Sequence, residues 1–332
     1  MKRIASKLGW AVLVIWAVVS LTFVVSNVLP SDPARMVAGP QARPADVARI
    51  RQQLGLDRSL ASQYASFITR LVHLGPTHVE KGDARHATCA TTGFLHFDLG
   101  KSYQLRRPVV DVLGERLPRS LMLAVGAVFL QVLLGVGAGI LAARFHKKPL
   151  DTALLGLSLL GVSAPTFILG LGLQYVLARR LHLLPLDGFG HTATEHAYCL
   201  ILPALTLGLV GAAYYTRIVR EDMLGVLPQD FIRTARAKGA TETRVLLRHA
   251  LGMVWLPIIT MIGMDLGALV GGAVVTEALF RWPGIGALSV TALLDRDGPM
   301  IVGTVLVTST AIVLSNVLVD LLYGVLDPRI RR

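Results

Sequence analysis

The sequence predicts an all-α integral membrane protein. We expect six transmembrane helices, both termini in the cytoplasm, and a helical extracytoplasmic segment between the first two helices. Hydrophobic residues make up 53% of the 332 residues and charged residues only 16%, whereas soluble domains carry about 25% charged residues. Apolar windows long enough to cross a bilayer occur six times. Basic residues gather in alternate loops between these windows.

The apolar windows define the expected membrane helices. They cover residues 8–29, 119–143, 151–178, 198–218, 252–278 and 300–325. The first window could be a cleaved signal peptide, but its apolar run of about 22 residues exceeds the 7–15 residues of such a segment. No small-residue cleavage motif follows it, so we expect a retained helix.

The basic residues of the short loops determine the expected orientation. With the N-terminus in the cytoplasm, the inner segments hold sixteen Lys and Arg residues and the two short outer loops hold four. The positive-inside rule therefore places both termini inside. The basic residues behind the formal net charge of +12 lie largely beside the apolar windows, as this topology requires. The charge therefore does not indicate nucleic-acid binding.

These expectations divide the chain into four parts. They are the N-terminus with the first helix (1–29), the extracytoplasmic segment (30–117), a five-helix core with a cytoplasmic loop at about 219–251 (118–326), and a cytoplasmic tail (327–332). Two stretches of the outer segment, ADVARIRQQLGL and SLASQYASFITRLV, space their apolar residues as amphipathic helices do. The residues from His73 to His96 lack such periodicity, and we expect an irregular loop there.

Nucleotide, metal and catalytic motifs are not evident in the sequence. FDLGKS ends like a phosphate-binding loop, but Leu95 stands where that motif requires glycine. The outer segments are rich in histidine, and metal capture is one interpretation. We favour a polar loop with no metal, because no HxH or HxxxH pair occurs. No nucleophile–base pair is evident either, so we expect neither an enzyme nor a cofactor.

The two cysteines, Cys89 and Cys199, are both expected outside the membrane or at its outer edge, where disulfides can persist. Either a Cys89–Cys199 disulfide or two thiols fit the sequence.

Polar residues inside the apolar windows are candidates for a translocation pathway. Asp265 lies midway along the fifth window, where a carboxylate costs a few kcal/mol and normally faces a cavity or a partner. It either lines a polar pathway or forms a hydrogen bond with a neighbouring helix. Weaker signals of the same kind come from Gln131, Gln174 and Asn316.

Small residues and prolines are candidates for helix packing and gating. A small-residue face in the fifth window, suited to close contact with a helix of this chain or of a second subunit, is formed by Gly263, Gly267 and Gly271. Pro165 should kink the third helix. Trp282 and Pro283 lie in RWPGIG, which predicts a tight turn after the fifth helix.

Several stretches resemble one protein family. RTARAKG resembles the cytoplasmic signature loop of bacterial ABC importer permeases, and YYTRIVREDMLGVLPQDFIRTARAKG is closer still to the dipeptide/oligopeptide/nickel subfamily. SDPARMVAGPQARPADVARIRQQLGLDRSLASQY, FDLGKSY, LPRSLMLA, SAPTFILG, GGAVVTEALFRWPGIG and the closing DPR fit as well. Together they resemble the B-type permease. Two departures stand out: the stretch near Val72–His96 looks inserted, and Gly252-Met253 replaces a polar or Pro-containing pair.

The resemblance implies a non-catalytic, pathway-forming permease of an ATP-driven importer in the bacterial inner membrane. Di- and oligopeptides are the favoured cargo, with nickel or a metal chelate as the alternative. The implied partners are a second, C-type permease, two ATPase subunits, an extracytoplasmic binding protein and membrane lipid, with no nucleic acid. A proton-coupled secondary transporter centred on Asp265 is a different class, which the lack of an evident inverted repeat disfavours.

The resemblance also assigns ATPase coupling to a short helix within the signature loop. Its residues are Asp230, Arg233, Thr234, Ala235, Arg236, Ala237, Lys238 and Gly239. Asp230 can cap the N-terminus, Lys238 suits the C-terminus, and Gly239 can end the helix. A basic loop held to anionic lipid is the alternative explanation.

Overall fold

The computed structural model describes residues 2–28, 33–39, 41–53, 55–75, 88–92 and 94–326. Among these residues, four helices are long and apolar enough to cross a membrane, or five if one bent pair counts as a single span. The chain forms two compact units, which are described separately. One comprises Met1–Pro118 with Ile285–Thr310, and the other comprises Arg119–Gly284 with Ala311–Arg332.

The first unit begins with four helices. These are α1 (Lys2–Val28), α2 (Pro33–Ala38), α3 (Pro44–Gln53) and α4 (Leu60–Leu71). The two predicted amphipathic helices are confirmed as α3 and α4, whereas α2 was not predicted. On α1 the apolar stretch Gly9–Val24 is shorter than the other candidate spans. Helix α4 packs on α1, since Phe67 stacks on Phe23 at 5.1 Å and the hydroxyls of Tyr64 and Ser20 lie 2.6 Å apart.

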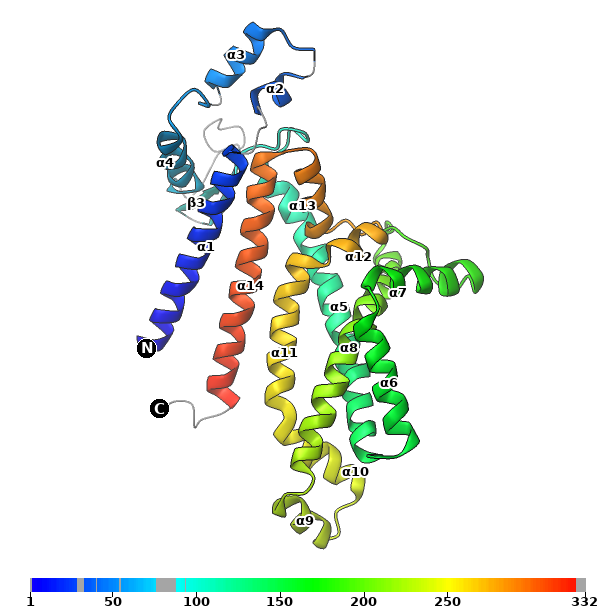
Figure 1. Ribbon diagram of the computed structural model, residues 1–332. Coiled ribbons are helices and arrows are strands. Elements are labelled where there is room, and N and C mark those ends of the chain that lie inside the picture. The colour runs from blue at the N-terminus through cyan, green and yellow to red at the C-terminus, as the bar shows by residue number, and fades with distance from the viewer. Residues whose placement is uncertain are drawn as a thin grey trace. The chain divides into compact units, whose positions relative to one another are not determined.

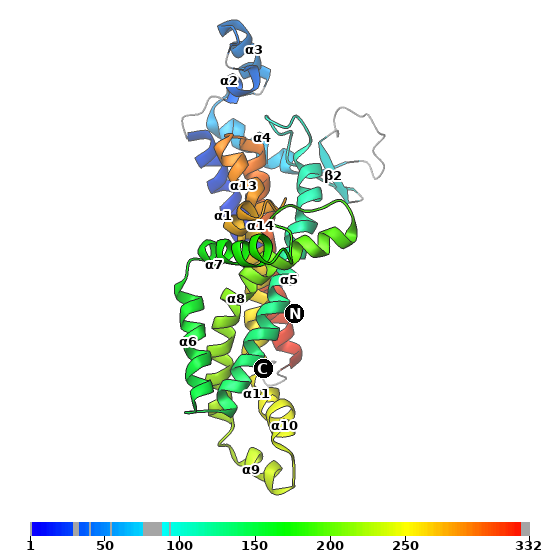
Figure 2. The same cartoon turned by 90° about the vertical axis from the view of Figure 1, so that its right-hand side faces the viewer.

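A small antiparallel sheet follows α4. Its strands are β1 (Val72–Leu74), β2 (Cys89–Thr92) and β3 (Leu95–Asp98), in the order β1-β3-β2; β3 is labelled in Figure 1 and β2 in Figure 2. The predicted irregular loop is therefore wrong for these residues, and the fold is not purely α-helical. Strands of three or four residues are too short to give a reliable alternating pattern. Residues 76–87 lie outside the described part of the chain.

The first unit also holds an apolar core made by distant segments. Residues Val109, Val112 and Leu113 from the start of α5 (Val109–Arg144) pack against α13 (Ile285–Leu294) and Met300 of α14 (Gly298–Leu326). Helices α5 and α14 contain the second and sixth predicted windows. Helix α13 was not predicted, because it has only ten residues and lies in the expected outer loop.

In the second unit, the third predicted window is broken rather than kinked. Helix α6 (Pro149–Ser163) ends at Ala164, and α7 (Thr166–Leu173) with the π-helical turn η1 (Gln174–Arg180) continues after Pro165 at 108° to α6. Both views show α7 running across the direction of α6 (Figures 1 and 2). Pro165 lacks an N–H and holds the residue before it extended, at φ −81° and ψ 129°.

The remaining elements of the second unit are two long helices, α8 and α11, with short helical elements between them and after α11. They are α8 (Ala193–Val226), α9 (Asp230–Ala237), α10 (Glu242–Arg244), the π-helical turn η2 (Val245–Ala250), α11 (Leu251–Gly272) and α12 (Val274–Leu279). Helix α8 contains the fourth predicted window and begins with a capping box of Thr192 and Glu195. The fifth predicted window, 252–278, is wrong in its extent, because the helix breaks at Ala273.

Candidate functional site

Helix α9 is the short helix that the signature loop predicts. Figure 1 shows it beyond the ends of α8 and α11, at the opposite end of these helices from α7 and α12. The predicted cap by Asp230 is wrong: the N-cap is Gln229, whose side chain makes no capping hydrogen bond. Asp230 is the first helical residue, and its carboxylate accepts a hydrogen bond from Arg233 Nη1 at 3.3 Å. Its charge still lies in the first turn, where the helix dipole favours an anion.

The end of α9 confirms the role predicted for Gly239. Lys238 is the C-cap, and Gly239 has a φ of +82°, which a residue with a side chain rarely adopts. The Gly239 N–H donates to Arg236 O at 2.9 Å, and the Ala240 N–H donates to Ala235 O at 3.1 Å. These two bonds form a Schellman motif, which satisfies carbonyls at the end of the helix.

One residue anchors α9, and most of the others face outward. Ile232 is fully buried in an apolar cluster with Tyr215, Val219 and Val245. The exposed residues are Asp230, Phe231, Arg233, Thr234, Arg236, Ala237, Lys238 and Gly239, and Ala235 is half-buried. Arg236 forms an ion pair with Glu242, at 2.8 Å between Nε and Oε1. The helix therefore presents a small-residue, basic surface on a fixed base.

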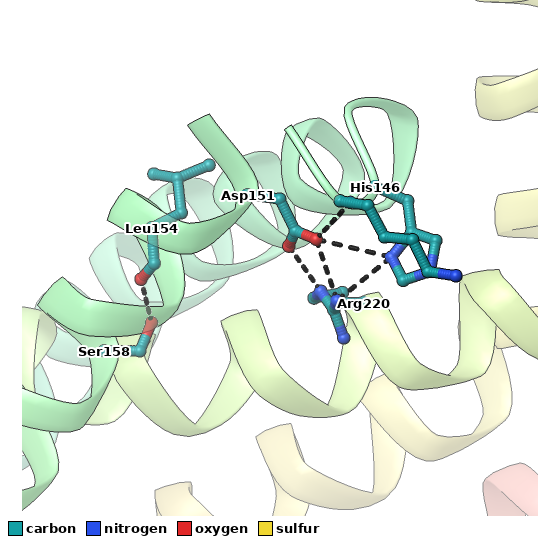
Figure 3. Close-up of polar contacts among 6 residues, drawn as sticks. His146, Asp151, Leu154, Ser158 and Arg220 are labelled. Atoms are coloured by element: carbon teal, nitrogen blue, oxygen red, sulfur yellow. Dashed lines mark hydrogen bonds and ion pairs between the residues drawn. The ribbon is translucent and has the colours of Figure 1, made fainter. Parts of the chain in front are cut away.

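A buried ion pair joins α6 to α8 and was not predicted from the sequence (Figure 3). Asp151, in the first turn of α6, is 3% exposed. It accepts hydrogen bonds from Arg220 Nε at 2.6 Å and Arg220 Nη2 at 2.9 Å. The backbone N–H of Lys147 donates to it at 2.9 Å, and His146 Nδ1 lies 3.3 Å away.

This ion pair ties the α5–α6 turn and the start of α6 to α8. Arg220 lies close to the end of α8 that leads into α9. The same end of α8 therefore holds the start of α6 through the ion pair and continues into α9. The sequence does not reveal the pair, because its members are 69 residues apart and lie on different helices. A carboxylate in the first turn of an apolar helix was the available signal.

The structure gives Asp265 a partner. Its Oδ2 accepts a hydrogen bond from Tyr215 on α8 at 2.9 Å, which agrees with the helix–helix interpretation. The other pathway candidates have different environments. Gln131 is buried and donates to Leu207 O at 3.4 Å, and Gln174 is buried and donates to Leu186 O at 3.0 Å.

Asn316 is exposed on α14. The described hydrogen bonds thus join none of these four candidates to one another, and their pathway role stays a prediction.

The small-residue face of α11 contacts a helix of the same chain. A Cβ added at Gly263 would collide with Val319 of α14, and one added at Gly267 would lie 2.9 Å from Ser315 Cβ. This is the first of the two arrangements that the sequence allowed. Gly271 is half-buried near the end of α11.

The RWPGIG turn is held by a buried indole. Trp282 is fully buried, and its Nε1–H donates to Arg119 O at 3.0 Å. Pro283 is half-buried, and a Cβ added at the following Gly284 would collide with the carboxylate of Glu277. Glu277 is also fully buried and accepts a hydrogen bond from Ser120 Oγ at 2.8 Å. The sequence predicts a tight turn here, and the structure adds that its residues are packed against buried polar groups.

No disulfide joins the described residues Cys89 and Cys199, which are both thiols. Cys199 lies on α8. Cys89 lies on β2, where its thiol gathers with His73 and His96.

Comparison with known proteins gives a consistent family. Residues 135–332 match the model of the binding-protein-dependent transport system inner membrane component, and residues 1–124 match the model of the N-terminal part of such membrane components. The chain of the inward-facing MetNI methionine ABC transporter has a similar fold, with a TM-score of 0.54 and 18% identity over 66% of this chain and 98% of that chain.

Relatives at higher identity span nearly the whole chain. The probable D,D-dipeptide transport system permease DdpB of Escherichia coli K12 is 38% identical, with 97% of this chain and 95% of that protein covered. The glutathione transport system permease GsiC of Escherichia coli O6:H1 is 37% identical, with coverages of 94% and 92%. A putative peptide transport system permease of Brucella abortus strain 2308 is 37% identical, with coverages of 100% and 98%. The chain therefore belongs to the family of inner membrane components of binding-protein-dependent transport systems.

Proposed function

We propose that this chain is the B-type permease of an ATP-driven importer and that α9 couples it to ATPase subunits in the cytoplasm. In this arrangement a second permease completes the pathway, and an extracytoplasmic binding protein delivers the cargo. The chain crosses the bacterial inner membrane six times, with α1 as the first span, the α6–α7 pair as the third, and both termini inside. The basic residues of the inner loops support this orientation.

The observation that carries the coupling role is the combination of exposure and support in α9. A helix that docks on a partner needs an accessible face and a firm connection to the elements that it moves. Ile232 and the Schellman motif supply the connection. The half-buried Ala235 and the exposed Lys238 are three residues apart and so lie on one side of the helix end, where they combine little steric bulk with positive charge. A lipid-bound basic loop would need neither a buried anchor nor a closed helix end.

The motion follows from this geometry. The sequence contains no evident nucleotide-binding motif, so ATP binding by the partner subunits supplies the free energy for the motion. Movement of the docked α9 would pass to α8 and α11, which flank it in the chain. The spans would then exchange outward and inward openings as two states of different nucleotide affinity.

Peptides are the cargo that we propose. The three relatives named above carry D,D-dipeptide, glutathione and peptide in their names, and all three cargoes are peptides or peptide-like molecules. Nickel or a metal chelate remains the alternative cargo. Growth on dipeptides as the amino-acid source, compared with growth under nickel limitation, separates the two after deletion of the gene.

The coupling role is tested by cargo-stimulated ATP hydrolysis in the reconstituted importer. Lys238→Glu combined with Arg233→Glu should abolish the stimulation, because both side chains are exposed and neither belongs to the core. Arg233→Glu also removes the exposed ion pair with Asp230, which adds little to stability. Gly239→Pro should do the same, since proline cannot adopt a φ of +82°. Gly225→Ala, at an exposed site in α8 with open space around it, is the matched control and should keep full stimulation.

Arg236 needs a different design because it is bonded to Glu242. Arg236→Glu alone would break this pair as well as change the docking surface. The exchange Arg236→Glu with Glu242→Arg restores the pair and leaves only the surface charge pattern altered. If this exchange and the double variant Lys238→Glu with Arg233→Glu both retain cargo-stimulated hydrolysis, α9 does not couple the subunits.

A further inference from the structure

Three metal-ligating side chains lie on one face of the small sheet. Residues that face each other in paired strands point to the same side. His73 on β1 and Thr91 on β2 both pair with His96 on the central strand β3. Cys89 is two residues from Thr91 and therefore shares its face. The strand register alone brings His73, Cys89 and His96 together, although the sequence between them contains no compact metal motif.

The distances suit coordination of one ion. One ligand atom from each of the three side chains lies within 4.8 Å of the other two. The Cys89 Sγ and His73 Nε2 atoms are 3.8 Å apart. Tetrahedral zinc with a Zn–S bond of about 2.3 Å and Zn–N bonds of about 2.0 Å requires about 3.5 Å between these atoms. A small adjustment of side-chain rotamers would therefore bring the ligands onto an ion.

The orientation of His73 matches that of a metal ligand. Its Nδ1 lies 3.0 Å from the carbonyl oxygen of Arg70. A carbonyl oxygen only accepts, so Nδ1 carries the proton and Nε2 keeps its lone pair toward Cys89. Histidine ligands in metal sites are held in the same way, with the second ring nitrogen donating to a carbonyl or carboxylate.

The other histidine is enclosed. His96 is fully buried, and its ring contacts that of His73 with a centroid distance of 5.4 Å. Gly75 makes room for this ring, because an added Cβ would lie 2.5 Å from His96 Cε1 and 2.7 Å from its Nδ1. The imidazole therefore occupies a fixed place that any larger residue at position 75 would disturb.

We propose that His73, Cys89 and His96 bind one zinc-like divalent cation. Two imidazoles and one thiolate form a donor set that zinc accepts, and the fourth position is open to an exogenous ligand. On binding, the Cys89 thiol releases its proton to solvent as the sulfur–metal bond forms.

The ion would join all three strands of the sheet. Three strands of three or four residues bury little apolar surface, and sheets this small gain stability from a metal cross-link. The stretch that holds these ligands is the one that looks inserted relative to the family pattern. The site is therefore a property of this insertion and is independent of which cargo the transporter carries.

Alkylation of Cys89, measured by peptide mass spectrometry on the detergent-solubilised full chain, tests the proposal. Zinc ions in excess over EDTA should slow the reaction of Cys89 by at least about tenfold, because a metal-bound thiolate is a weak nucleophile. His73→Gln should remove this protection, since loss of a ligand weakens binding by more than the 10–100-fold typical of outer-shell changes. Cys199 supplies an internal control whose rate should not respond to zinc.

Matched variants separate binding from misfolding. His191→Gln, at an exposed histidine far along the chain on the 181–192 loop, should keep the protection. In EDTA, Cys89 of the His73→Gln protein should be alkylated at the same rate as Cys89 of the unaltered protein. A faster reaction would show that the substitution disrupts the sheet and exposes Cys89. In that case cobalt(II) titration of the unaltered chain decides, through a thiolate-to-cobalt charge-transfer band that saturates at one ion and is retained in Cys199→Ser. Equal Cys89 rates with and without zinc, together with the absence of this band, would overturn the proposal.

Discussion

Removal of Arg220 should destabilise the protein more than any other single charge change on α8. Asp151 is 3% exposed and receives two of its hydrogen bonds from this guanidinium. Arg220→Met leaves a buried carboxylate whose remaining hydrogen-bond partners among the described residues are the Lys147 N–H and His146 Nδ1. Breaking a buried pair costs about 3–5 kcal/mol. We expect the lower end, about 3 kcal/mol, because the Lys147 bond remains and the Arg220 side chain is 19% exposed.

The measurement is thermal. A loss of about 3 kcal/mol lowers the midpoint of thermal unfolding by about 4 °C in a chain of this size. The detergent-solubilised protein is heated, and the remaining monodisperse fraction is measured by size-exclusion chromatography. Asp151→Asn should cost less, because the orphaned guanidinium can turn toward solvent. The double variant should recover to within about 1 kcal/mol of the unaltered protein, since no buried charge remains.

The control is Arg217→Met, at an exposed arginine one turn earlier on α8. It should change stability by no more than about 0.5 kcal/mol. Two results would contradict this reasoning. Arg220→Met could unfold at the same temperature as Arg217→Met, or the loss of stability in Asp151→Asn with Arg220→Met could equal the sum of the two single losses. Either would show that the Asp151–Arg220 pair does not hold α6 to α8.

Three further predictions concern single sites. Gly239→Ala adds a side chain at φ +82° and should cost about 1 kcal/mol locally, seen as faster tryptic cleavage within α9; an unchanged rate would show that the helix end tolerates the strain. Gly263→Ala should cost about 1–3 kcal/mol through its collision with Val319, and adding Val319→Ala should restore the melting temperature; no rescue would place the contact elsewhere. Alkylation without reductant should modify both Cys89 and Cys199, whereas a disulfide-linked peptide pair would contradict the structure.

The parts of the structure that follow from short-range rules were predictable. Helix α9 and its end at Gly239 depend on residues within one or two turns, so the sequence signals and the structure agree. The amphipathic helices α3 and α4 and the long helices α5, α8 and α14 follow from periodicity and length. The cap at Asp230 was misplaced by one residue, which is the usual scale of error at a helix end.

The features that depend on distant partners were not predictable. A proline announces a lost hydrogen bond but not the direction of the chain after it, so Pro165 predicted a kink and the structure has a turn of 108°. The Asp151–Arg220 pair and the His73–Cys89–His96 cluster each join separate elements. Strand register and helix packing are not visible in a linear motif, so neither the ion pair nor the ligand cluster could be predicted from the sequence.

The π-helical turn η2 affects how the surface of α11 must be mapped. A turn closed by i→i+5 bonds holds about one residue more than an α-helical turn. Each residue of an α-helix covers about 100° of rotation, so every side chain after Ala250 is rotated by about that angle from the place that regular counting from Glu242 would assign. Cross-links or spin labels designed by α-helical periodicity from α10 toward Asp265 would therefore face the wrong neighbour. Their positions should be counted from within α11, starting at Leu251.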